Sequence, residues 1–251
     1  MGDRNQRGKT SLAEYAAATA TGACRARNED SFAILSEWNV FLIVDGQGPD
    51  AAGLTVAGFT SAFTQEPART DPGLPGADSL ARAVLLAHGD LHRTMLTEQS
   101  SRGQGAALAA AWVSQGWIRT AHVGDCRLGR VREGKLEWLT QDHSLEAAMR
   151  LSGDPPEEIA RLRETHANVI TRAVGASKDL VVDLAYHPTA PEDVYVLCSD
   201  GLTRHVSFAR IARRAAATER SLTERCADLL EATEAAGGAD NATVLLLRIR
   251  R

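Results

Sequence analysis

The sequence predicts a layered α+β sandwich. Groups of strand-like segments stand between pairs of helical segments, and the chain has no internal repeat. The strand-like segments are short apolar runs, several of which end in Asp-Gly or Asp-Asn, whereas the helical segments carry apolar residues every three or four positions. This grouping favours sheets covered by helix pairs over a strictly alternating parallel sheet. We expect residues 1–251 to form one domain.

The expected strands are apolar runs bounded by turn-forming residues. They cover Ala13–Thr21, Ser31–Leu35, Val40–Val44, Ala106–Ser114, Trp117–Val123, Leu128–Arg132, Leu136–Leu139, Leu180–Tyr186, Val194–Cys198 and Thr243–Ile249. A glycine-containing loop is expected from Asp45 to Gly53, and Glu133-Gly134 is typical of a hairpin turn.

The expected helices have one apolar face. They cover Ala51–Phe63, Ala77–Thr97, Leu145–Leu151, Glu157–Glu164, Ser207–Ala217 and Ser221–Ala235. Ser144 can cap the third helix, and residues 153–156 (Gly-Asp-Pro-Pro) separate it from the fourth. The Pro/Gly-rich segment 67–76 is expected to be an exposed connection.

Composition excludes several classes of protein. With 44% hydrophobic and 24% charged residues, the chain is not expected to be disordered. A net charge of −4 argues against a nucleic-acid partner, and no apolar run approaches the roughly 20 residues that span a membrane. The four cysteines lack CxxC spacing, so we expect buried thiols in a reducing cytoplasm rather than a zinc or disulfide framework.

Carboxylates recur at the ends of the apolar runs. Asp45, Asp125, Asp200 and Asp240 each stand beside a glycine, an asparagine or both, and the pair Glu29-Asp30 precedes them. If these ends converge, each pair of anions repels by roughly 4 kcal/mol at 4 Å and an effective dielectric near 20. A divalent cation offsets that repulsion, and oxygen ligands favour Mg²⁺ or Mn²⁺. For any single Asp-Gly pair, the alternative to a metal-binding role is that the aspartate only stabilises a turn.

These motifs together resemble a known family. RARNEDSF, VDGQG, AHVGDCRLGRV, LTQDHSL, ITRAVG, VLCSDGLT and GGADNATVLLL occur in the order typical of the metal-dependent protein phosphatases of type 2C, from residue 25 to residue 247. The resemblance implies a four-layer α-β-β-α sandwich with two central, mainly antiparallel sheets and a binuclear metal site at one end. It also implies hydrolysis of phosphoserine and phosphothreonine in proteins by a metal-bridging water, opposing a serine/threonine kinase.

The resemblance also assigns metal ligands. Asp45 is expected to bridge two Mn²⁺ or Mg²⁺ ions, with the backbone carbonyl of Gly46 on one of them. Asp200 and Asp240 are expected to hold the other ion. The pair Glu29-Asp30 would ligate the first ion or orient water on it, and which of the two carboxylates does so stays open.

Further positions follow from the same resemblance. Asp125 matches the residue that, together with the Asp200 position, binds a third and weaker ion in bacterial relatives. The alternative is that its carboxylate only accepts hydrogen bonds from the backbone of its own loop. Arg25 stands four residues before Glu29 and is expected to bind phosphate. His143 is either a proton shuttle or a structural histidine near a helix start.

The chain departs from the family pattern in the site loops. Gln47 stands where relatives carry His or Met and cannot act as an acid, so protonation of the leaving group would fall to metal-bound water. Pro49 removes an amide donor from the next loop. Ala106 replaces a residue with a hydroxyl group, and Cys126 replaces a serine. These changes put in question the rate of hydrolysis, the affinity for metal and the binding of a third ion.

Residues 144–168 match the variable flap of the family and could contact a substrate protein or be a merely exposed insertion. The protein is expected to be monomeric, with a phosphoprotein as substrate. Alternatives from other classes are a regulatory phosphoprotein-binding module with little turnover and a two-metal nuclease, which the acidic net charge disfavours.

Overall fold

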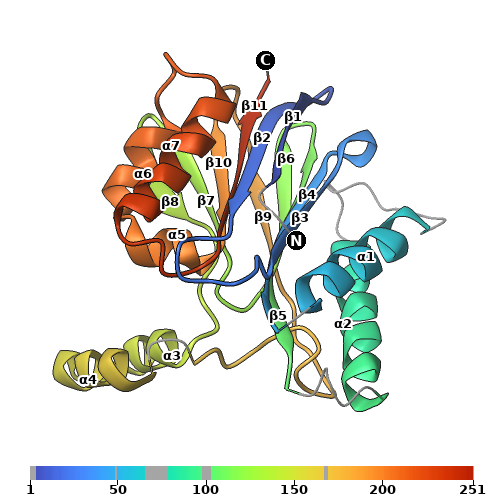
Figure 1. The fold of residues 1–251 in the computed structure, drawn as a ribbon. Coiled ribbons are helices and arrows are strands. Elements are labelled where there is room, and N and C mark those ends of the chain that lie inside the picture. The colour runs from blue at the N-terminus through green and yellow to red at the C-terminus, as the bar shows by residue number, and fades with distance from the viewer. Residues whose placement is uncertain (1–3, 49, 66–78, 98–102, 167–168, 251) are drawn as a thin grey trace.

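Two antiparallel sheets stacked face to face form the centre of the molecule (Figure 1). The computed structural model describes residues 4–48, 50–65, 79–97, 103–166 and 169–250. The exposed connection expected over 67–76 and the predicted effect of Pro49 lie outside these residues, as do the first two positions of the helix expected from Ala77.

The first sheet has the strand order β1-β2-β11-β10-β7-β8. Its strands are β1 (Arg4–Lys9), β2 (Ala13–Ala20), β7 (Arg127–Arg132), β8 (Lys135–Trp138), β10 (Val194–Cys198) and β11 (Ala242–Ile249). The second sheet has the order β3-β4-β5-β6-β9. Its strands are β3 (Asp30–Leu35), β4 (Val40–Gln47), β5 (Gly105–Ser114), β6 (Trp117–Val123) and β9 (Asp183–Pro188).

Helices cover the outer face of each sheet. The second sheet is covered by α1 (Ala51–Thr64) and α2 (Ser79–Thr97). The first sheet is covered by α5 (Asp200–His205), α6 (Phe208–Ala215) and α7 (Leu222–Ala235). This arrangement confirms the predicted α-β-β-α sandwich. Among the described residues, no helix combines the length and the apolar character that a membrane crossing requires.

The alternation of side chains along the strands produces the layers. In β4, Leu42 and Val44 pack under α1 and α2, whereas Phe41 and Ile43 point into the core between the sheets. Because successive side chains on a strand face opposite ways, apolar residues at every position fill two cores at once. The same division in β10 and β11 supplies the inter-sheet core and the core beneath α7.

Two helices extend away from this body. They are α3 (Leu145–Ser152) and α4 (Pro156–His166), which Figure 1 shows projecting beside the lower end of the sandwich. The Ser144 hydroxyl accepts a hydrogen bond from the Ala147 amide, as expected for a cap, and Gly153 ends α3 in the left-handed conformation.

The structure differs from the expectations in four elements. Strand β1 was not predicted because RNQRGK has no apolar residue, yet its backbone pairs with β2 at the sheet edge. Helix α5 was not predicted because it is a short helix that begins at Asp200 itself. Strand β9 begins and ends later than the predicted 180–186, and the predicted loop start at Asp45 belongs to β4.

Candidate metal centre

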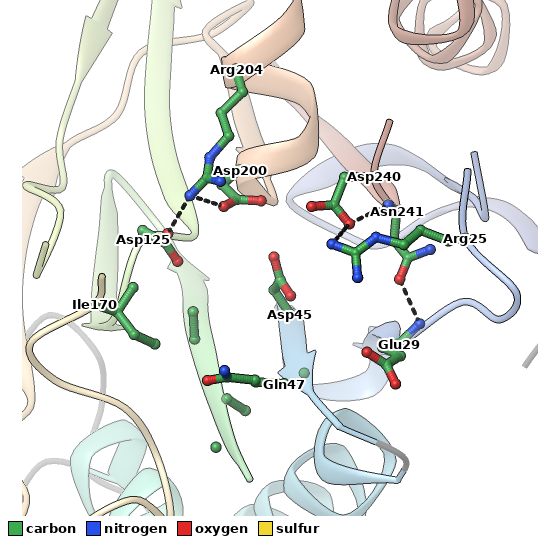
Figure 2. Close-up of a pocket in the computed structure, with 14 residues that line it drawn as sticks. Arg25, Glu29, Asp45, Gln47, Asp125, Ile170, Asp200, Arg204, Asp240 and Asn241 are labelled. Atoms are coloured by element: carbon green, nitrogen blue, oxygen red, sulfur yellow. Dashed lines mark hydrogen bonds and ion pairs between the residues drawn. The ribbon is translucent and has the colours of Figure 1, made fainter. Parts of the chain in front are cut away.

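Carboxylates from five places in the chain converge on one cavity. Asp45 lies near the end of β4, Asp125 lies between β6 and β7, Asp200 starts α5, and Asp240 precedes β11. With Glu29 they line a cavity of about 200 Å³ (Figure 2). The other lining residues are Arg25, Gly46, Gln47, Gly105, Ala106, Ala107, Ile170, Arg204 and Asn241. The structure therefore brings together the site predicted from the sequence, except for Asp30.

Glycines allow two of these carboxylates to sit where they do. Gly124 has a φ of +93°, and a Cβ there would lie 2.4 Å from the Ala107 Cβ, so the turn that presents Asp125 requires glycine. A Cβ on Gly201 would lie 1.9 Å from the backbone oxygen of Asn241. This close approach holds the start of α5 against the chain that carries Asp240.

The two neighbouring carboxylates Glu29 and Asp30 have different surroundings. Glu29 faces the cavity, and its backbone amide donates to the Asn241 side-chain oxygen at 2.9 Å. Asn241 in turn donates to the backbone oxygen of Arg27 at 3.0 Å, so its side chain orients the segment that carries Glu29. The geometry thus favours Glu29 over Asp30 as the carboxylate of this pair that reaches the cavity.

Asp30 is buried behind the cavity and links the two sheets. Its side-chain Oδ2 accepts hydrogen bonds of 2.7 Å from Ser199 and from Thr243, which belong to the other sheet and its following loop. Thr243 also contacts the Thr19 hydroxyl at 2.7 Å, and Asn28 donates to Thr19 at 2.8 Å. Among the described residues, Asp30 Oδ1 has no hydrogen-bond partner. Such a network rigidifies the floor beneath the site.

Burial and mutual repulsion raise the pKa values of the site carboxyls. Burial raises the pKa of Asp45 well above its usual range, and Asp30, Asp200, Asp125 and Asp240 add to the shift. Burial, with Asp200 next in size, raises the pKa of Asp125 to about 7, although Arg204 acts against it. Carboxyls that resist ionisation together indicate a place where positive charge is required.

Two arginines provide positive charge at the rim. Arg25 contacts Asp240 Oδ1 at 2.8 Å and remains 44% exposed (Figure 2). Arg204 contacts Asp200 Oδ2 at 2.5 Å and Asp125 Oδ2 at 3.5 Å. Sequence reasoning predicted Arg25 but missed Arg204, whose spacing of four residues after Asp200 on a helix was the available signal.

The donor set fits hard divalent ions. The acidic residues that line the cavity all offer carboxylate oxygens, and Gly46 lines it with backbone atoms. Carboxylate and carbonyl oxygens are the ligands that Mg²⁺ and Mn²⁺ prefer. The unpartnered Oδ1 of buried Asp30, beside Asp45, is a further oxygen atom that nearby positive charge would stabilise.

A second group of ligand-type side chains lies apart from this cavity. Single ligand atoms of His122, His143 and Asp183 lie within 4.8 Å of one another. His143 Nδ1 accepts a hydrogen bond of 3.0 Å from the Gly124 amide, so its proton lies on Nε2, which faces Asp183. Arg172 contacts both His143 and Asp183, which makes the group a hydrogen-bonded ion network. His143 holds the Asp125 loop and does not line the cavity, as a structural histidine would.

The cysteine prediction was right for three residues and wrong for one. Cys126, Cys198 and Cys226 are buried, and burial raises the pKa of Cys198 and of Cys226 to about 12. Cys24 is exposed, because it lies in the open loop between β2 and β3.

The chain is similar to bacterial phosphatases over nearly its whole length. It is 26% identical over 236 residues to the serine/threonine phosphatase Stp of Listeria innocua, covering 91% of this chain and 93% of that protein. The crystal structure of the Mycobacterium tuberculosis phosphatase PstP/Ppp matches with a TM-score of 0.84 and 26% identity, over 96% of this chain and 100% of that one.

A structure of the PstP catalytic domain in complex with two manganese ions matches with a TM-score of 0.80 and 26% identity, over 96% of this chain and 99% of that chain. No protein-family model matches the sequence. The ordered motifs, the four-layer fold, the carboxylate cavity and these relatives agree with one another. Together they support the placement of this chain among the metal-dependent serine/threonine protein phosphatases of type 2C.

Proposed function

We propose that this protein hydrolyses phosphoserine and phosphothreonine in proteins, using two Mn²⁺ or Mg²⁺ ions held in the carboxylate cavity. The observation that carries the proposal is the convergence of Asp45, Asp200, Asp240 and Glu29 on one cavity that also contains Arg25. The relatives named serine/threonine phosphatases, and the manganese-bound PstP domain, support it. Residues 1–251 would act as a single catalytic domain.

The ligand roles follow from where the oxygens lie. Asp45 is central among the carboxylates and would be shared between the two ions, with the Gly46 carbonyl on one of them. Asp200 and Asp240 would hold the other ion. Glu29, rather than the buried Asp30, would orient water at the first. When bound, the ions supply activation of a water molecule and positive charge opposite the phosphoryl oxygens.

The chain's own residues position the substrate. The Arg25 guanidinium can donate two parallel hydrogen bonds to phosphoryl oxygens, a geometry that suits a phosphate monoester. Its contact with Asp240 keeps it at the cavity rim before substrate arrives. Gln47 lines the cavity and can donate a hydrogen bond to the leaving oxygen, but its amide cannot supply a proton as an acid.

The test is hydrolysis of a phosphothreonine peptide with Mn²⁺, Mg²⁺ or a chelator. Turnover should require metal, and Asp45→Asn and Asp200→Asn should each lower kcat/KM at least about 100-fold, or roughly 2.7 kcal/mol of transition-state stabilisation. Circular dichroism of each variant checks that the fold is retained. Peptide binding without turnover under every metal would favour the regulatory binding module instead.

We also propose that the flap, residues 144–168, guides the protein substrate. A cavity of about 740 Å³ lies between α3 and the body and shares Asp125, Asp200 and Arg204 with the metal cavity. Trp138, Phe208 and Leu151 contribute apolar surface to it. A peptide chain that leaves the metal cavity on this side would enter this second, larger cavity.

Deletion of residues 155–164 tests the flap. Hydrolysis of a small aryl phosphate should persist, whereas hydrolysis of a phosphoprotein should fall. Equal loss for both substrates would contradict substrate guidance. A cognate kinase, a monomeric state and a cytoplasmic location stay predictions.

A further inference from the structure

The guanidinium of Arg204 lies between two carboxylates of the metal cavity. One of its terminal nitrogens, Nη2, is 2.5 Å from Asp200 Oδ2 and 3.5 Å from Asp125 Oδ2. Figure 2 shows both contacts, with the guanidinium directed toward the gap between the two aspartates. A single positive group therefore bridges them.

Local structure holds Arg204 in this position. Arg204 follows Asp200 by four residues in α5, so the two side chains lie on the same face of the helix. The Arg204 side chain is 29% exposed, whereas the side chains of Asp200 and Asp125 are 13% and 11% exposed. Because a guanidinium stays charged at every physiological pH, the pair of buried carboxylates always has a cation beside it.

This position is where a third divalent ion would bind. An ion shared by Asp125 and Asp200 must approach an oxygen of each to roughly 2.0–2.2 Å. The Arg204 nitrogen already lies against the Asp200 oxygen and faces the Asp125 oxygen. An ion and a guanidinium cannot both occupy that gap, and their like charges repel at such short range.

We propose that Arg204 takes the place of a third ion, so that this protein binds two divalent ions and no third at Asp125. The proposal rests on the proposed two-ion centre and concerns how that centre is limited. Arg204 leaves the second oxygen of Asp200 for the ion shared with Asp240. It acts as a positioning residue that neutralises Asp125 and orients Asp200.

The test counts bound ions and does not depend on turnover. The protein of residues 1–251 is dialysed to equilibrium against increasing Mn²⁺. Bound metal is measured by mass spectrometry and free Mn²⁺ by electron paramagnetic resonance. The wild-type protein should bind two ions per chain. Arg204→Ala should bind three, the third more weakly, whereas Arg204→Lys, which keeps the charge, should bind two.

Two further variants locate the added ion. The double variant Arg204→Ala with Asp125→Asn should return to two ions, because the third then lacks a ligand. Arg213→Ala removes an exposed arginine from neighbouring α6 and should leave two ions bound. Thermal unfolding of each variant with Mn²⁺ checks that the count refers to folded protein.

Opposite results would overturn the inference. A wild-type protein that binds three ions and loses one in Asp125→Asn would show that Arg204 does not exclude the third. An Arg204→Ala protein that binds only two would show that Asp125 and Asp200 do not form a site even when the guanidinium is gone. Absence of bound Mn²⁺ in every variant would overturn the two-ion centre itself and this inference with it, which distinguishes the two failures.

Discussion

Asp30 and Asp45 lie directly opposite each other on the paired strands β3 and β4. Opposed residues on antiparallel strands have neighbouring side chains on the same face, so two carboxylates here are close and unfavourable when both are ionised. Asp45 lines the carboxylate cavity, whereas Asp30 bonds across to Ser199, which follows β10, and to Thr243 in β11. The pair therefore connects the site to the packing of the two sheets.

The raised carboxyl pKa values should make the stability of the metal-free protein fall as pH rises from about 4 to about 7. Burial raises the pKa of Asp30 to about 7, against an ordinary value of 3.8, and raises that of Asp45 well above its usual range. Each folded carboxyl then binds a proton that its unfolded form has lost, so ionising it at higher pH costs stability. Burial lowers the pKa of His122 to about 4, which has the opposite effect only below about pH 6.5.

Differential scanning calorimetry checks this pH dependence. The Tm of the chelator-treated protein should decrease by several degrees over that interval, since about 1 kcal/mol corresponds to about 2–4 °C in a chain of this size. Added Mn²⁺ should raise the Tm most at the alkaline end. A Tm that stays level or rises in metal-free protein would contradict the electrostatic reading.

Loss of a hydroxyl that serves Asp30 should destabilise the fold. Ser199→Ala and Thr243→Val each remove a hydrogen bond to the buried Asp30 Oδ2 and should lower the free energy of unfolding by about 1–3 kcal/mol. Ser152→Ala removes an exposed hydroxyl that bonds only within α3, and should change it by less than about 0.5 kcal/mol. Urea unfolding measures the free energy of unfolding of the three variants. Equal losses in all three would show that the hydrogen bonds to Asp30 do not stabilise the fold more than an exposed hydroxyl does.

Gly201→Ala should disturb the site, whereas a matched glycine substitution should not. The added methyl group would meet the Asn241 backbone oxygen at 1.9 Å, which pushes Asp200 away from Asp240. We expect weaker Mn²⁺ binding and a loss of about 1–3 kcal/mol of stability. Gly53→Ala in α1 meets no atom within 4 Å and should stabilise the protein by up to about 1 kcal/mol. Mn²⁺ titration and thermal unfolding of both variants decide the matter.

One thiol should react in the native protein. Cys24 is exposed, whereas the other three cysteines are buried, and burial raises the pKa of Cys198 to about 12. A chromogenic disulfide reagent should therefore modify one thiol in native protein and four after denaturation. Cys24→Ser should abolish the native reaction, and a second reactive native thiol would contradict the burial of the other three cysteines.

The strands were the most predictable part of the fold. VFLIV has apolar residues at every position and TVLLLRI has them at five of seven. Such runs are typical of strands buried on both faces, and both segments lie in the interior of a sheet. Strand β1 could not be predicted because its residues are polar, and it exists through backbone pairing with β2. Local pattern cannot reveal a strand whose stability comes from its neighbour.

The candidate site was predictable as a set of residues and not as an arrangement. The ordered Asp motifs indicated the carboxylates that the cavity contains, and the family resemblance indicated Arg25. The choice between Glu29 and Asp30 could not be made, because it depends on where β3 begins: Asp30 is the first residue of the strand and bonds to the other sheet, whereas Glu29 precedes the strand and lines the cavity.

By itself, the sequence determined which segments are apolar on both faces and which carboxylates end them, since both properties belong to neighbouring residues in the chain. Tertiary structure alone decided that Arg204 meets Asp125, 79 residues away, and that Asp30 bonds to Thr243 across the two sheets. Such contacts depend on how the helices and sheets pack. The local pattern of residues specifies each element but not the distance between side chains that different elements bring together.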